Sequence, residues 1–150
     1  MPLPTVVDSS PDARFLRYEV EYPGFTTERL YAAWTEPEEL RGWWPVEARV
    51  DLREGGEYEF RWPKIGVVLL GNYLEVRPGE RLAFTWLWAH ELGAPEQVVR
   101  LSFGAVEGGA RLVLEHGLFA EGEEGAGHRR SIAEGWEHFL PRIAGLARER

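Results

Sequence analysis

The chain contains no cysteine and a single lysine, Lys64, among its 150 residues. The absence of cysteine excludes disulfides, thiolate catalysis and zinc sites built from cysteine. With one lysine and a formal net charge of −8, the sequence offers no basic stripe for DNA, RNA or an anionic membrane surface. Partners of these two classes, nucleic acid and membrane, are therefore not expected.

Long apolar runs are missing as well. The longest one, VVLL at residues 67–70, is far shorter than a membrane span, and the first twelve residues hold no signal-peptide pattern. The cytoplasm is therefore the expected location. The length predicts a single domain over residues 1–150, with residues 1–12, which contain three prolines, as an irregular lead-in.

Aromatic residues are plentiful: seven Trp, seven Phe and five Tyr. Each large ring buries on the order of 150 to 250 Å². Such residues suit a thick core or the wall of a pocket.

The first third of the chain predicts one strand and two short helices. Apolar and charged residues alternate over residues 14–22, which is typical of a strand with one buried face. Residues 26–34 have helical spacing after a threonine start signal. Residues 35–44 begin again with Thr35 and Glu38 in capping-box spacing and with Pro37 in the first turn.

Residues 46–117 have a period of two, interrupted by glycine- and proline-containing turns, which predicts an antiparallel meander. One face of these strands is apolar and the other polar, so the apolar face needs a cover. The predicted strands are residues 46–52, 57–62, 67–76, 81–89, 97–106 and 110–116.

The expected cover is a helix over residues 129–148, whose apolar residues recur every three or four positions. The glycine- and glutamate-rich residues 120–127 before it are expected to form a loop, either a flexible flap beside a pocket or a solvated connection. Gly135 is expected to let the helix approach the sheet closely, and Pro141 to bend it.

Five segments resemble the START-like superfamily, in the branch named after activators of the Hsp90 chaperone ATPase. They cover nearly the whole domain in the order typical of that family. The segments are ERLYAAWTEPEELRGWWP (28–45), DLREGGEYEFRW (51–62), GNYLEVRPGERLAFTW (71–86), ARLVLEHG (110–117) and EGWEHFLPRIAGL (134–146).

The resemblance implies an α+β helix-grip fold. One strand, two short helices and a six-stranded antiparallel meander make a seven-stranded curved sheet that grips a long C-terminal helix. It also implies a small hydrophobic or aromatic ligand in a cavity between sheet and helix, with no cofactor. Members that catalyse cyclisations suggest an alternative, a cyclase- or dehydratase-like enzyme.

A second alternative is a regulator of an Hsp90-type chaperone or another interaction module. It is the weakest of the three, because the co-activators that give the family its name carry a chaperone-binding domain before this one, and here only about a dozen residues precede the fold. A homodimer through Trp44 or an edge strand is a further option.

Aromatic residues on the inward face are the candidate ligand-binding residues, with plain core packing as the alternative for each. Trp44 is a candidate for exposure at the mouth of the pocket. The candidates are Trp43, Tyr58, Phe60, Trp62, Phe84, Trp86, Trp88, Phe103, His116, Trp136 and Phe139.

No catalytic residue is assigned, but His116 and His90 are weak candidates for acid-base chemistry. A hydrogen-bonded structural role is the alternative for His116, and a rim position without a task for His90. Glu134 and His138 have the i, i+4 spacing of metal ligands, but the sequence places no third ligand, so no metal site is expected. A hydrolase triad lacks a nucleophile motif.

Overall fold

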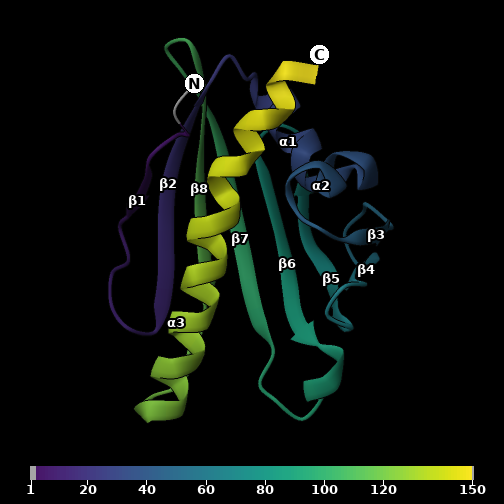
Figure 1. The fold of residues 1–150 in the computed structure, drawn as a ribbon, viewed down its shortest axis with the longest axis vertical. Helices are drawn as coiled ribbons and strands as arrows, with labels where there is room; N and C mark the ends of the chain where they lie inside the picture. Colours follow the sequence, from purple (N-terminus) through teal and green to yellow (C-terminus); the bar gives the residue numbers. More distant parts are fainter. Residues whose placement is uncertain (1–2, 150) are drawn as a thin grey trace.

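The computed structural model describes residues 3–149, and within them eight strands form one antiparallel sheet. The order across the sheet is β1-β2-β8-β7-β6-β5-β4-β3, and α3 lies across one face of it (Figure 1). The elements are β1 (Val6–Asp8), β2 (Phe15–Pro23), α1 (Thr27–Thr35), α2 (Pro37–Trp43), β3 (Glu47–Val50), β4 (Glu57–Trp62), β5 (Val67–Arg77), β6 (Arg81–Trp88), the 3₁₀ helix η1 (Ala89–Glu91), β7 (Gln97–Val106), β8 (Gly109–Gly117), α3 (Gly122–Phe139) and the 3₁₀ helix η2 (Leu140–Glu149).

The predicted α+β helix-grip architecture is confirmed, with one strand more than predicted. β1 lies within the residues expected to be an irregular lead-in and pairs with β2, Val6 opposite Val20. A tight turn follows it, in which the Ser10 backbone N–H donates to Asp8 Oδ1 over 2.9 Å. The sheet therefore has eight strands. Proline is tolerated at the edge of a sheet, so the prolines before and after β1 are compatible with this three-residue edge strand.

β2 joins the start of the chain to the last strand. It pairs with β8 along its whole length, from Phe15 opposite Gly117 to Pro23 opposite Gly109. Alternate β2 residues face inward and are buried, as the period of two predicts. The buried β2 residues are Leu16, Tyr18, Val20 and Tyr22.

The predicted loop at residues 120–127 is wrong, because α3 begins at Gly122. Gly125 explains the difference: a Cβ there would lie 1.7 Å from the Ala120 carbonyl oxygen. A glycine that looks like a helix breaker is thus what lets the first turn fold back on the preceding residues. Glu123 and Glu124 in that turn suit the positive end of the helix dipole.

The C-terminal helix changes type at Pro141. The α-helix ends at Phe139 and the 3₁₀ helix η2 begins at Leu140, so the α-helix stops beside Pro141, where the sequence predicts a bend, and does not continue to residue 148. Proline has no N–H for an α-helical bond, so this is where the pattern is interrupted. The Leu140 carbonyl accepts a 2.7 Å hydrogen bond from the Tyr22 hydroxyl, which fixes the junction to β2.

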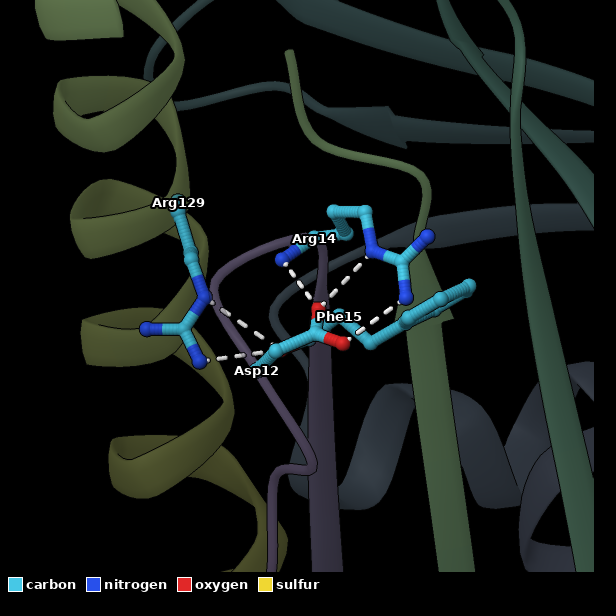
Figure 2. A network of polar contacts seen from close by, with 4 residues as sticks. All are labelled: Asp12, Arg14, Phe15 and Arg129. Atoms are coloured by element: carbon cyan, nitrogen blue, oxygen red, sulfur yellow. Dashed lines mark hydrogen bonds and ion pairs between the residues drawn. The ribbon is translucent and has the colours of Figure 1, made fainter. Parts of the chain in front are cut away.

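An arginine ties the N-terminal half of α3 to the sheet. Arg129 donates from Nε and Nη2 to the Phe15 carbonyl oxygen, over 3.2 and 2.8 Å. Figure 2 shows Arg129 reaching toward Phe15 from the helix, while Arg14 pairs with Asp12 in the turn just before β2. The position of α3 along the sheet is therefore set near its middle by Arg129 and at its C-terminal end by Tyr22.

The helix pair α1 and α2 packs at the other end of the molecule. Thr26 caps α1 by accepting from the Arg29 N–H. The predicted capping box of α2 is wrong: Thr35 belongs to α1, where its hydroxyl donates to the Tyr31 carbonyl. A largely buried ion pair between Arg29 and Glu39, 3.1 Å long, joins the two helices.

Candidate functional site

A groove of about 190 Å³ lies between the sheet and α3. We call it the aromatic groove. Its walls come from the end of α2, from β4, β5 and β6, from the turn between β4 and β5, and from α3. The lining residues are Trp44, Trp62, Ile65, Val67, Trp86, Trp88, Ser131, Ile132, Gly135, Trp136 and Phe139.

The inner wall of the groove is a cluster of tryptophans around Trp44. This residue follows α2 and is 4% exposed, so the predicted exposure at a pocket mouth or interface is wrong, although Trp44 does line the groove. It stacks on Trp43 at 4.9 Å with 8° between the rings. Its ring also contacts Trp34, Trp62, Trp86 and Trp136.

The neighbouring tryptophans of the groove are tilted against one another by 34° to 89°. Trp44 and Trp62 lie at 89°, and Trp86 and Trp88 at 85°. Trp62 and Trp88 lie at 52°, with 5.4 Å between their centroids. The walls thus meet at corners and do not form a slot with parallel sides.

Gly135 keeps the helical side of the groove open. A Cβ at this position would meet no atom within 4 Å, so the predicted close approach of helix and sheet at Gly135 is wrong. The neighbouring Trp136 fills the interior, whereas Ile132 and Phe139 are only half-buried because the groove lies beneath them. The missing side chain leaves room that a larger residue would occupy.

Five of the predicted ligand-binding residues line the groove: Trp62, Trp86, Trp88, Trp136 and Phe139. The others do not. They are buried in the core, which is the packing alternative; these residues are Trp43, Tyr58, Phe60, Phe84, Phe103 and His116.

Tyr58 illustrates how position along a strand separates the two groups. It shares a face with Phe60 and Trp62, but its ring lies over Gly71, where a Cβ would come within 2.4 Å of it. Its hydroxyl donates to the Thr85 carbonyl. Tyr58 therefore covers an irregular part of the β5–β6 ladder, while Trp62 at the far end of β4 reaches the groove.

His116 faces inward, as predicted, but is fully buried and has both ring nitrogens engaged. The Trp136 indole N–H donates to Nδ1 over 3.1 Å, so Nδ1 is the unprotonated nitrogen. Nε2 then carries the proton and donates to Gln97 Oε1 over 2.9 Å. Burial, aided by the charge of His128, lowers the pKa of His116 to about 3.

This arrangement supports the structural alternative for His116. The imidazole is neutral, lies outside the groove lining and has no free position for a substrate proton. Gln97, which sequence reasoning missed, continues the chain of bonds by donating to the Leu118 carbonyl over 3.1 Å. The network fixes Trp136 at the back of the groove.

The remaining ionisable candidates lie outside the groove. His90 is exposed in η1, beside Trp88 at 6.0 Å between ring centroids, and approaches Glu91. Glu134 and His138 are both exposed on α3. Among the described residues, no group of three His, Asp or Glu side chains could hold a metal ion.

Five of the lining residues have no predicted place at a pocket, whereas Trp44 is a predicted candidate for the pocket mouth. Ile65 is 70% exposed at the rim, and Gly135 and Ser131 have side chains too small to indicate a pocket wall. A signal existed for Val67 and Ile132, which are apolar residues near the ends of predicted elements. What the groove can do is hold an apolar group, since none of its described lining residues is charged.

Comparisons with known proteins agree with this architecture. The family model described as "Activator of Hsp90 ATPase homolog 1-like protein" matches residues 25–148. None of the curated proteins matches the sequence. No helix among the described residues is long and apolar enough to cross a membrane.

Several solved structures are similar to the chain. A protein from Mesorhizobium loti has a TM-score of 0.77 and 21% identity, covering 91% of this chain and 98% of its own. A structure described as an HSP90 activator from Plasmodium falciparum has a TM-score of 0.73 and 21% identity, covering 89% of this chain and 95% of its own. A protein from the dynemicin biosynthetic locus has a TM-score of 0.74 and 21% identity, covering 89% of this chain and 46% of its own. Identities of this size show the fold alone.

Proposed function

The chain belongs to the family of Activator of Hsp90 ATPase homolog 1-like proteins, and from there we propose that it binds a small molecule by an apolar or aromatic group in the aromatic groove. The observation that carries the proposal is the groove itself. It remains open between sheet and helix although the rest of the interior is filled by large side chains. Its lining is apolar apart from the hydroxyl of Ser131 and the indole N–H groups of the tryptophans, of which that of Trp86 is buried without a hydrogen-bond partner.

The volume limits the ligand. A dry apolar cavity of about 150 Å³ holds one benzene ring, and the aromatic groove measures about 190 Å³. Pockets for whole drug-sized molecules are larger, roughly 300 Å³ or more. The groove is thus suited to one ring, or to one compact apolar group of a larger molecule.

An enzyme of the cyclase or dehydratase type finds less support. General acid-base catalysis needs a titratable group within hydrogen-bond reach of the substrate. His116 is enclosed by Gln97 and Trp136, and His90 lies outside the groove lining. The chaperone alternative finds its support in the family and in the similarity of the fold to that of the HSP90 activator from Plasmodium falciparum.

A thermal-shift screen with single-ring aromatic and small apolar compounds tests the proposal. A ligand that binds only the folded state, at about 100 times its Kd, raises the free energy of unfolding by about 2.7 kcal/mol. For a chain of this length the Tm then rises by about 5 to 10 °C. Native mass spectrometry after mild purification shows whether a compound is retained.

Two matched variants of α3 locate the binding. Gly135→Leu places a side chain in the aromatic groove and is expected to abolish the shift. Gly127→Leu makes the same change two turns earlier in α3. A Cβ at this position also meets no atom within 4 Å, but Gly127 does not line the groove. A Tm shift that survives Gly135→Leu, or a screen without any stabilising compound, contradicts the proposal.

A further inference from the structure

The angles between the groove tryptophans favour a compact group over a flat one. A flat ring stacks on one wall and can meet a second wall only with its edge. In the aromatic groove the neighbouring indoles meet at angles between 34° and 89°, and none of these pairs is parallel. A roughly spherical group can touch the faces of several of these rings at once, whereas a flat ring can stack on only one of them.

The electrostatics of the same rings favour a cation. The face of an aromatic ring carries the negative part of its quadrupole, and tryptophan attracts cations most strongly. Five of the eleven lining residues are tryptophans, and none of the eleven is charged. The formal net charge of −8 adds a long-range attraction for positive ligands.

The scarcity of polar groups selects among cations. A primary ammonium buried here would leave N–H donors without acceptors, which costs free energy. A methylated ammonium carries no such donors when fully substituted and has an apolar surface. The Ser131 hydroxyl at the edge of the groove is the one side-chain hydrogen-bonding group besides the indole N–H groups in the lining.

We propose that the aromatic groove binds the methylated ammonium group of a small organic cation. The inference rests on the proposed function and narrows its ligand class. Trp44, Trp62, Trp86, Trp88 and Trp136 form the cage, with Trp88, the half-buried member, at its outer side.

Isothermal titration calorimetry with two probes of equal shape tests the inference on the unmodified protein. Choline carries a trimethylammonium group, and 3,3-dimethylbutan-1-ol replaces its nitrogen by carbon and is neutral. Because cation–π attraction acts on choline alone, choline is expected to bind about tenfold more tightly. Added salt weakens the binding of choline and leaves that of the alcohol unchanged.

Variants of Trp88 separate ring electrostatics from apolar contact. Trp88→Phe keeps a weaker aromatic face and Trp88→Leu keeps only apolar volume, so affinity for choline is expected to fall in the order Trp, Phe, Leu. The affinity for the neutral alcohol is expected to fall less than that for choline through the series, since that ligand loses apolar contact but has no charge for the ring to attract.

Charge reversal at the rim provides a second, fold-neutral test. Lys64 is exposed in the turn next to Ile65, and Lys64→Glu is expected to raise the affinity for choline several-fold. Arg130→Glu changes the charge equally at an exposed position of α3 that does not line the groove, and is the control. Its smaller effect measures the contribution of net charge alone.

The outcomes distinguish the inference from the proposed function. If the neutral alcohol binds as tightly as choline or more tightly, the proposed preference for a cation is wrong, and the groove remains a binding site for apolar groups. If neither probe binds while the screen finds another ligand, the inference is again overturned alone. If neither probe nor any screened compound binds, both are overturned.

Discussion

At the scale of single residues, His116 shows that an inward-facing histidine can serve the core without serving chemistry. Its imidazole accepts from Trp136 and donates to Gln97, so it acts as a neutral link between helix and sheet. Protonation would turn Nδ1 from an acceptor into a donor that faces the indole N–H. The pKa of about 3 reflects the cost of a charge in this enclosed place.

The pH dependence of stability follows from that pKa. Between the ordinary histidine pKa of about 6.5 and about 3, the unfolded chain binds a proton that the folded protein does not. The contribution of this group to stability is therefore constant above about pH 6.5 and falls as the pH drops, by up to about 1.4 kcal/mol per pH unit. Urea unfolding at about pH 7, 6 and 5 measures the slope.

A matched pair of histidine variants assigns the slope. His116→Gln is expected to flatten it while lowering stability at neutral pH, because a buried hydrogen bond is weakened. His90→Gln, an exposed change in η1, leaves the slope as it was. An equal slope in His116→Gln would mean that other groups cause the acid sensitivity.

Two glycines of α3 are predicted to respond to alanine in opposite directions. At Gly135 the new methyl enters open space, so the higher helix propensity of alanine raises stability by about 0.5 to 1 kcal/mol. At Gly125 the methyl would lie 1.7 Å from the Ala120 carbonyl oxygen, so the first turn must move and stability falls. Chemical denaturation of both variants gives the signs, and a loss in Gly135→Ala would show that the position is packed.

At the scale of elements, the C-terminal half of α3 borders the aromatic groove and is held by contacts before and after this stretch, and within it by the bonds of Glu137 to Tyr18 and of Trp136 to His116. Arg129 binds the Phe15 carbonyl, and the Tyr22 hydroxyl binds the Leu140 carbonyl. Between them Ile132, Gly135 and Phe139 border the groove. A helix supported in this way can keep a space beneath it without collapsing onto the sheet.

Removing the Arg129 anchor is expected to loosen the start of the helix. Arg129→Leu deletes two hydrogen bonds from a charged donor, a loss of about 1 to 3 kcal/mol. Amide exchange over residues 122–130 should become faster, with little change in β6 and β7. Arg130→Leu, an exposed change at the next position, is the control, and equal exchange in the two variants would contradict the anchoring role.

At the scale of the whole molecule, the periodicity of the sequence was enough to predict the architecture. Alternation over 14–22 and 46–117 and helical spacing near the C-terminus match β2, the meander and the stretch that covers the sheet. The wrong predictions concern residue types that occur in two kinds of structure. Glycine is common in loops, so the sequence predicts a loop around Gly125, and it does not show that the Ala120 carbonyl packs against this position in the helix.

The groove could be predicted only in part, for a related reason. Periodicity shows which residues face inward, but not how deep each lies beneath the helix. Phe60 and Trp62 share a face, and only Trp62 lies far enough along β4 to border the space under α3. Gly135 contributes by having no side chain, and an absence of atoms has no signature in hydrophobic spacing.

The pairing of β2 with β8 also bears on how the protein is made. Residues 24–108 separate the two strands, so during synthesis β2 waits roughly 5 to 20 s before its partner has left the ribosome, at about 5 to 20 residues per second. Until then only the three-residue β1 can pair with it, and the inward face formed by Leu16, Tyr18, Val20 and Tyr22 stays wet. The nascent chain thus carries an apolar strand whose edge finds its partner when β8 emerges, while its inward face is covered only when α3 and η2 follow.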